Sequence, residues 1–177
     1  MILNPKMSSL VAPETFNGIR GNASNVTTCL KPEFTMGRSR STPAKSSGLR
    51  YQRKVEKWLK SHYGAHSLFI GQWLEYRDAS GRRYAQPDAW VIGRTKVALF
   101  EIKVGHSELA WWQLKKLYLP LLAQLYELPV VPVEIVKSYD PLAFFPGPHS
   151  VVFTPDELKR ELVQHRDESV VVFQCQP

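Results

Sequence analysis

The chain has 177 residues, of which 44% are hydrophobic, enough for one ordinary domain with a real core and an additional terminal segment. No apolar run approaches the roughly 18 residues that a membrane-spanning helix needs, so the sequence pattern predicts no such helix. Cys29 and Cys175 match no metal-binding or redox spacing, and we expect a reducing compartment and no structural disulfide.

The formal net charge of +7 is distributed unevenly along the chain. Residues 1–50 hold seven Lys/Arg and two Glu, a net charge of +5, whereas residues 51–177 hold sixteen basic and fourteen acidic side chains, a net charge of +2. Residues 1–47 also lack hydrophobic periodicity and are rich in Ser, Thr, Asn, Gly and Pro. We therefore expect an extended or disordered basic arm over 1–47, which either touches an anionic polymer or only aids solubility, and a folded domain over 48–177.

The first periodic segment is residues 49–62, which predict a helix with Ser47 as its N-cap. Glu56 lies among basic side chains on this helix. From the helix pattern alone it is a surface glutamate in ion pairs with residues three or four positions away. Arg53 and Lys57, on the same helix, are candidates for contacting DNA phosphates.

Three strands are expected next, over 67–76, 84–92 and 97–104, with turns at 78–81 and 93–94. Arg82 and Arg83 lie at the hairpin between the first two, where they either contact phosphate or are solvated turn residues. The strand over 84–92 carries Asp88 in the middle of its run, and Gln86 shares a face with Asp88.

The third strand alternates clearly between an apolar and a polar face. Its even positions from Ala98 to Val104 are all apolar, whereas Glu101 and Lys103 lie on the opposite face. An antiparallel pair with the preceding strand can place Asp88 beside these two residues. Two neighbouring carboxylates repel and are costly to bury, and a divalent cation with oxygen ligands, such as Mg²⁺, is the usual compensation.

Pro87-Asp88 followed by Glu101-x-Lys103 on the next strand resembles the motif of the PD-(D/E)xK, or restriction-endonuclease-like, nucleases. The resemblance implies an α/β fold with an αβββαβ core, in which a mixed central sheet is flanked by helices. It implies a Mg²⁺- or Mn²⁺-dependent nuclease, most simply an endonuclease on DNA. Asp88, Glu101, the Ile102 carbonyl and Glu56 would hold metal, and Lys103 would orient water or stabilise charge on phosphorus.

Residues 107–128 predict a long helix with Ser107 as N-cap and a kink or break at Pro120. Its leucine stripe should pack on the sheet. Trp111 and Trp112 at its start are read as core or interface residues in preference to a base-stacking pair. His106, in the loop before it, is either catalytic or a loop residue that happens to lie nearby.

The same helix carries further candidates that the resemblance suggests. Related nucleases often place a Gln or Lys here to steady the water or phosphate, and Gln113 matches that placement; Lys116 is a candidate DNA contact. The RecB-like subgroup carries Gln-x-x-x-Tyr, but here Leu117 takes the tyrosine position and Tyr118 follows one residue later.

The remaining segments predict strands over 130–137, 150–153 and 169–174, a loop over 138–149, and a helix over 155–165. Pro132 suggests an edge or bulged position for the first of these strands. Residues 155–159, Pro-Asp-Glu-Leu-Lys, imitate the nuclease motif more literally than Asp88 and its partners. They instead predict a helix start, with Thr154 as N-cap and Glu157 completing a capping box.

Two other interpretations remain open from the sequence. The chain could be a DNA-binding or assembly component of a larger particle, such as a viral head or tail, with the arm docking on protein partners. It could also be a plain α/β domain in which Glu101 and Lys103 are an exposed strand pair. The expected compartment is the cytoplasm of a prokaryotic or virus-infected cell, or the virion for the assembly component.

Overall fold

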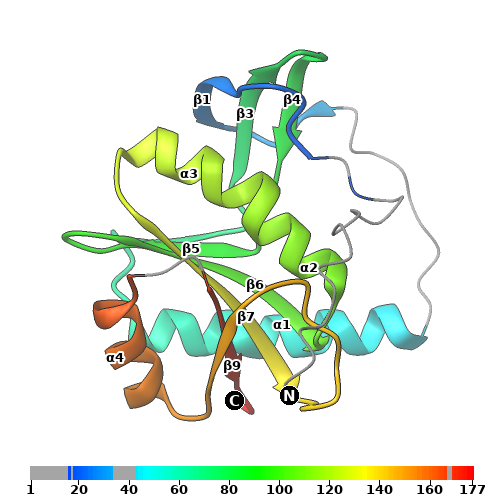
Figure 1. Cartoon of the computed structure of the whole chain (residues 1–177), viewed down its shortest axis with the longest axis vertical. Helices are drawn as coiled ribbons and strands as arrows, with labels where there is room; N and C mark the ends of the chain where they lie inside the picture. The colour runs from blue at the N-terminus through cyan, green and yellow to red at the C-terminus, as the bar shows by residue number, and fades with distance from the viewer. Residues whose placement is uncertain (1–15, 17, 34–42, 167–168) are drawn as a thin grey trace, which may run out of the picture.

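The computed structural model describes residues 16, 18–33, 43–166 and 169–177, which form a mixed α/β fold around a six-stranded sheet (Figure 1). The sheet is antiparallel over its first three strands and parallel over the others. In spatial order it comprises β2 (Leu68–Ile70), β5 (Ala89–Ile92), β6 (Val97–Gly105), β7 (Val130–Ser138), β9 (Val170–Gln174) and β8 (His149–Val152).

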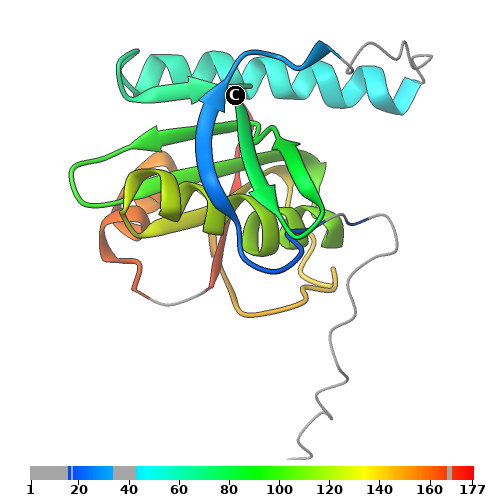
Figure 2. The same ribbon diagram turned by 90° about the horizontal axis from the view of Figure 1, so that it is seen from above.

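Helices cover both faces of this sheet (Figure 2). One face packs on α1 (Pro43–His62) and α4 (Pro155–Gln164), and the other on α2 (Glu108–Gln113), the π-helical segment η2 (Leu114–Tyr118) and α3 (Leu119–Tyr126). The alternation in β6 decides which side chain joins which layer. Ala98, Phe100 and Ile102 face α1, whereas Val97 and Leu99 face the α2–α3 side. Glu101 and Lys103 continue the second set.

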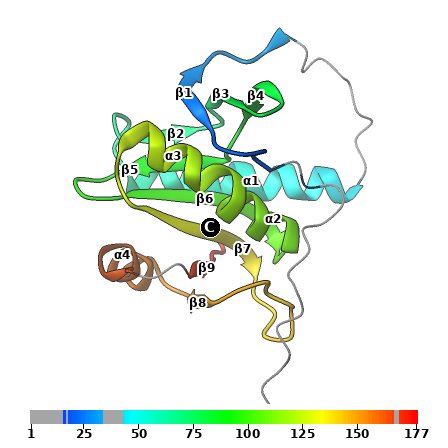
Figure 3. The ribbon, with the colours of Figure 1, turned by 45° about the horizontal axis from the view of Figure 1, so that its top comes forward.

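A second, three-stranded antiparallel sheet lies at one end of the molecule, above α3 in Figure 1 and Figure 3. Its order is β1 (Ser24–Cys29), β3 (Trp73–Asp78) and β4 (Gly81–Ala85). The continuous strands predicted over 67–76 and 84–92 are wrong in this respect, because each is divided between the two sheets.

The chain bends between the sheets at Gly71 and at Gln86-Pro87-Asp88. Gly71 has φ +57°, which an L side chain rarely adopts, and Pro87 has no N–H to give to a ladder. The two bends are joined: the Gly71 N–H donates to the Asp88 carbonyl at 2.9 Å, and Gln86 Nε2 donates to the Gly71 carbonyl at 2.7 Å. Asp88 consequently stands where β5 begins, not in the middle of a strand.

The structure also differs from expectation within the N-terminal 47 residues. Residues 24–29, which show no strand pattern, form β1 against β3 and bury Val26. Helix α1 begins at Pro43, so Ser47 lies inside it and is not its N-cap. Residues 1–15, 17 and 34–42 of the predicted arm lie outside the described residues.

Strand β7 occupies the middle of the sheet, between β6 and β9, so the edge position suggested by Pro132 is wrong. Pairing with β9 begins at Val133, so at Pro132 the ladder to β6 is the one that is formed. No helix within the described ranges is long and apolar enough to cross a membrane.

The predicted interruption near Pro120 takes the form of the π segment η2, in which the Leu119 N–H bonds to the Leu114 carbonyl five residues back. Pro120 follows at the start of α3, and a proline inside a regular α-helix would clash with the carbonyl four residues earlier. The wider turn of η2 lies where that clash would occur. The leucine stripe packs into the core as expected, with Leu114 and Leu121 fully buried.

Candidate active site

Asp88 lies at the point where β5 separates from β6. In the register of the two strands Ala89 is opposite Phe100, so the preceding residue meets Glu101. Beyond this point β6 has backbone groups that β5 no longer pairs, and the Ile102 N–H donates to Asp88 Oδ2 at 2.7 Å. The Asp88 carboxylate therefore takes the place of a strand partner for the Ile102 N–H. This bond holds it beside the face of β6 that carries the odd-numbered residues.

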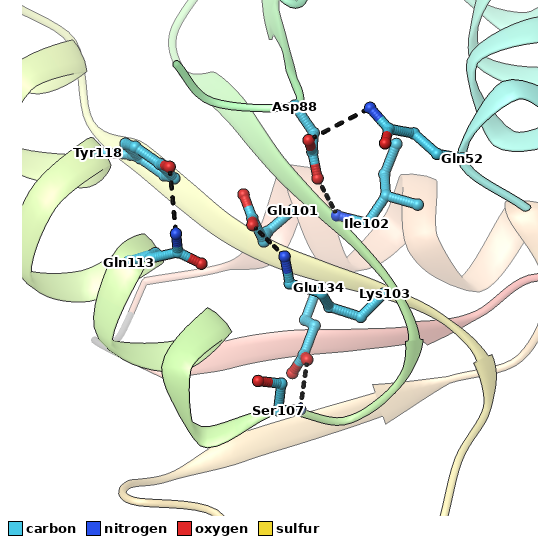
Figure 4. A network of polar contacts seen from close by, with 9 residues as sticks. All are labelled: Gln52, Asp88, Glu101, Ile102, Lys103, Ser107, Gln113, Tyr118 and Glu134. Atoms are coloured by element: carbon cyan, nitrogen blue, oxygen red, sulfur yellow. Dashed lines mark hydrogen bonds and ion pairs between the residues drawn. The ribbon is translucent and has the colours of Figure 1, made fainter. Parts of the chain in front are cut away.

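Glu101 and Lys103 lie on this face as predicted, and they form an ion pair with Nζ 2.6 Å from Oε1 (Figure 4). Glu101 is only 3% exposed, so it is not part of an exposed strand pair. Its second oxygen, Oε2, is buried and has no hydrogen-bond partner among the described residues. A buried carboxylate oxygen without a donor is costly, and such a group is expected to receive a ligand.

The charges of these groups are strongly coupled. Burial raises the pKa of Glu101 from its ordinary 4.5 to about 7, the Asp88 charge adds to the rise, and Lys103 opposes it. Burial also raises the pKa of Asp88, against the Ile102 N–H and Lys103. Burial disfavours charged Lys103, but Glu101 and Asp88 outweigh this and the pKa of Lys103 is raised. The site favours binding a cation that would let both acids ionise.

Helix α1 reaches the site through Gln52. Its Nε2 lies 3.4 Å from Asp88 Oδ1 and 3.1 Å from Glu56 Oε1, so the amide bridges the two acids. Glu56 is thus at the edge of the site and does not contact Asp88 directly. Gln52 was not among the predicted site residues, although its four-residue spacing from Glu56 places both on one side of the helix.

The π segment also places two residues of the α2–α3 region together. Gln113 Nε2 lies 3.5 Å from the Tyr118 hydroxyl, a contact between residues five positions apart (Figure 4). In a regular α-helix residues four apart would face each other, but a π turn contains one more residue. The one-residue departure from Gln-x-x-x-Tyr is therefore compensated by η2. Burial, together with the charges of Glu101 and Asp88, raises the pKa of Tyr118, which keeps its hydroxyl protonated.

Behind the site lies a fully buried acid, Glu134 on β7, opposite Glu101 in the parallel register. Glu134 Oε2 is 2.6 Å from His106 Nδ1, and Glu134 Oε1 accepts the Ser107 N–H at 3.0 Å. His106 Nε2 is 2.9 Å from the Phe144 carbonyl. These contacts fix the β6–α2 connection. They favour a structural role for His106 over a catalytic one. Glu134 could have been singled out from the sequence, because it is a charged residue inside the otherwise apolar run 130–136.

The predicted nucleic-acid contacts are spread over several elements. Arg53 and Lys57 are exposed on α1, and Lys116 is exposed on η2. Arg82 pairs with Glu75 at 3.1 Å. Arg83 is half-buried and lines a pocket together with Gln113 and Tyr118. Trp111 and Trp112 are buried in the core, which agrees with the reading preferred from the sequence.

The acids of the site supply the kind of oxygen ligands that a divalent ion needs. Within the described residues, no three His, Cys, Asp or Glu side chains approach closely enough to hold a metal by themselves. Asp88 and Glu101 supply two carboxylates, and the orphaned Oε2 of Glu101 is a free oxygen donor. Mg²⁺ is commonly held by one or two carboxylates, with water and substrate phosphate completing its shell. The two acids fit that requirement.

Fold and site together define a mixed α/β protein with a buried acid pair and a lysine at the point where two antiparallel strands of the central sheet diverge. Comparisons of the chain with protein-family models, curated proteins and solved structures found no match in any of the three.

Proposed function

We propose that this protein is a metal-dependent nuclease with a restriction-endonuclease-like fold that hydrolyses phosphodiester bonds of DNA, most simply as an endonuclease. The observation that carries the proposal is the meeting of Asp88, Glu101 and Lys103 at one end of the β5–β6 pair. Glu101 and Lys103 lie on β6, and the Ile102 N–H fixes Asp88 beside them. Two acids with raised pKa values next to a lysine are suited to phosphoryl chemistry with a divalent ion.

The order of the elements supports this proposal. From α1, the chain continues through the bent strands β2–β3 and β4–β5, then β6, the α2–α3 segment and β7. When each bent pair is counted as one strand, this order agrees with the helix, three strands, helix, strand order of an αβββαβ core. The contact of Gln113 with Tyr118 further supports a likeness to the RecB-like subgroup.

Asp88 and Glu101 would hold Mg²⁺ or Mn²⁺, with the Ile102 carbonyl as a further oxygen and with Glu56 available beyond Gln52. The ion, when bound, would polarise a phosphate oxygen and lower the pKa of a coordinated water. Lys103 has a partly exposed ammonium beside the acids, and it would donate hydrogen bonds to the attacked phosphate or orient the water. Tyr118, with its retained proton, is a further donor facing the same place.

The test is a Mg²⁺-dependent cleavage assay on linear, circular and branched DNA and on RNA. We expect Asp88→Asn and Lys103→Ala to reduce cleavage at least a hundredfold while circular dichroism and the unfolding midpoint show a folded protein. The matched controls come from the Pro-Asp-Glu-Leu-Lys segment at 155–159, where Asp156→Asn and Lys159→Ala lie on α4 and should retain full activity.

Undiminished cleavage by either site variant would contradict the proposal. DNA binding without cleavage by the wild-type protein in Mg²⁺ or Mn²⁺ would favour the assembly component over the enzyme.

A further inference from the structure

A pocket of about 390 Å³ opens between the small sheet and the η2 segment, next to the acid pair. Residues from β3 and β4 form one wall, and Gln113, Leu117 and Tyr118 form the other. Tyr118 links the pocket to the site, since its hydroxyl experiences the charges of Glu101 and Asp88. Gln113 and Tyr118 thus belong both to the pocket wall and to the group of side chains around Glu101 (Figure 4).

The chemistry of the lining is unusual for a pocket so close to two acids. Five of its eleven residues are aromatic and none is acidic, and a guanidinium (Arg83) and two amides (Gln86 and Gln113) supply the polar groups. Flat apolar rings with a few amides and one cation favour a flat heteroaromatic ligand with hydrogen-bonding edges and a nearby negative charge.

Gln113 supplies the most specific signal. Its Oε1 is buried and has no hydrogen-bond partner among the described residues, while Nε2 is satisfied by the Tyr118 hydroxyl. If the amide is turned over, the tyrosine hydroxyl donates to the oxygen and the nitrogen is the atom left without a partner. In either orientation one buried polar atom of the amide has no hydrogen-bond partner among the described residues, and leaving it unsatisfied is costly.

From these features we infer that the pocket takes the unpaired base of a nucleotide adjacent to the scissile phosphate, so that the substrate of the proposed nuclease is DNA that is single-stranded at the site. This inference rests on the proposed function for the identity of the ligand. A base inside a duplex is stacked on both faces and paired along its edge, so it must leave the helix before it can enter such a pocket. A free strand offers that base without the cost of unpairing.

The experiment measures binding in EDTA, where metal-dependent cleavage does not occur. A fluorescent 12-nucleotide strand and the blunt duplex of the same sequence are titrated with wild-type protein. We expect the strand to bind at least about tenfold more tightly than the duplex. Gln113→Leu, which keeps the size and removes the amide, should weaken strand binding roughly three- to tenfold and leave duplex binding unchanged. Gln124→Leu, at an exposed position of α3, should change neither.

A second readout does not depend on a variant. Strands with 2-aminopurine at successive positions are added to the wild-type protein, and stacking on the aromatic lining should quench the fluorescence at one or two of them. Equal affinity for strand and duplex, or no quenching at any position, overturns the inference. If single strands bind and are quenched but no DNA is cut in Mg²⁺, the base pocket is supported and the proposed nuclease activity is contradicted. If DNA is cut but single strands are not preferred, the nuclease activity is supported and the base pocket is contradicted.

Discussion

Glu101 has almost no contact with water, yet only one of its carboxylate oxygens has a partner in the described chain. Lys103 satisfies that oxygen, and Asp88 is fixed nearby by the Ile102 N–H. A buried carboxylate oxygen without a hydrogen-bond donor lowers the stability of the fold, because it has lost its hydration and gained no bond in its place. A cation bound at Glu101 would supply the missing partner.

The raised pKa of Glu101 has a measurable consequence for stability. Because this pKa is about 7 in the folded chain against an ordinary value of 4.5, the folded state binds the proton more tightly than the unfolded state. Stability should therefore be highest below about pH 4.5 for this group, fall as the pH rises to about 7, and stay level above that. The size of the fall is on the order of 3 kcal/mol.

We expect Glu101→Gln to flatten this part of the profile, measured as urea unfolding free energies between pH 5 and pH 8 without metal. Asp88, whose pKa is also raised, will contribute a slope of the same sign at lower pH. Glu127→Gln, at an exposed glutamate, is the control and should leave the profile unchanged. A wild-type profile that rises over this interval would show that Glu101 is ionised without penalty.

The sequence was sufficient to place Glu101 and Lys103 on one face of β6, because strand alternation is a local signal, whereas the mid-strand position predicted for Asp88 was wrong. An acid and a lysine two positions apart in an otherwise apolar strand must share a face. Gln52 could not be found in this way, since its contact with Asp88 depends on where α1 docks against the sheet. Glu56 was predicted as a metal ligand, but the position of α1 on the sheet leaves the Gln52 side chain between Glu56 and Asp88.

At the scale of the elements, η2 decides which side chain faces Gln113. A regular helix would present Leu117 there, whereas the π turn presents Tyr118 and leaves Leu117 nearly buried in the core. Proline at position 120 was a visible signal for an interruption. Its form was not predictable, because a kink, a break and a π turn all relieve the same clash.

Exchanging the two residues tests this register. In the double variant Leu117→Tyr with Tyr118→Leu, the tyrosine regains the spacing of Gln-x-x-x-Tyr but leaves the site if η2 persists. We expect DNA cleavage to fall about tenfold, as in Tyr118→Phe, which removes only the hydroxyl. Cleavage by the exchanged variant at or above the wild-type rate would indicate a regular helix instead. Melting curves establish that each variant is folded.

The N-termini of α4 and α2 differ in their capping, and the difference can be measured. Thr154 accepts the Glu157 N–H and Glu157 returns the bond, which completes the predicted capping box, whereas Ser107 makes no side-chain cap on α2. We expect Thr154→Ala to cost about 1 kcal/mol of unfolding free energy and Ser107→Ala only a few tenths. Both should be read from urea midpoints. Equal losses would mean that the Thr154 cap contributes nothing in solution.

For the whole molecule, the arrangement of two sheets was the least predictable feature. Strand patterns located the segments of the central sheet, but no local pattern indicates that the chain passes from one sheet to the other at Gly71 or Pro87. Pairing of β1 with β3 joins residues 44 to 53 positions apart and depends on contacts that no window of sequence contains. The division matters for function, because the small sheet forms one wall of the pocket beside the site.

Metal binding should couple the site to the stability of the whole fold. A ligand that binds only the folded state stabilises it by about 2.7 kcal/mol at a hundred times its Kd, which is several degrees in Tm for a chain of this size. Protons compete for Glu101 below about pH 7. We therefore expect Mn²⁺ or Mg²⁺ to raise Tm more at pH 8 than at pH 6.

Asp88→Asn should lose most of this shift in Tm, and the control Asp156→Asn should keep it. A shift that persists in Asp88→Asn, or that is the same at both pH values, would place the metal elsewhere on the protein.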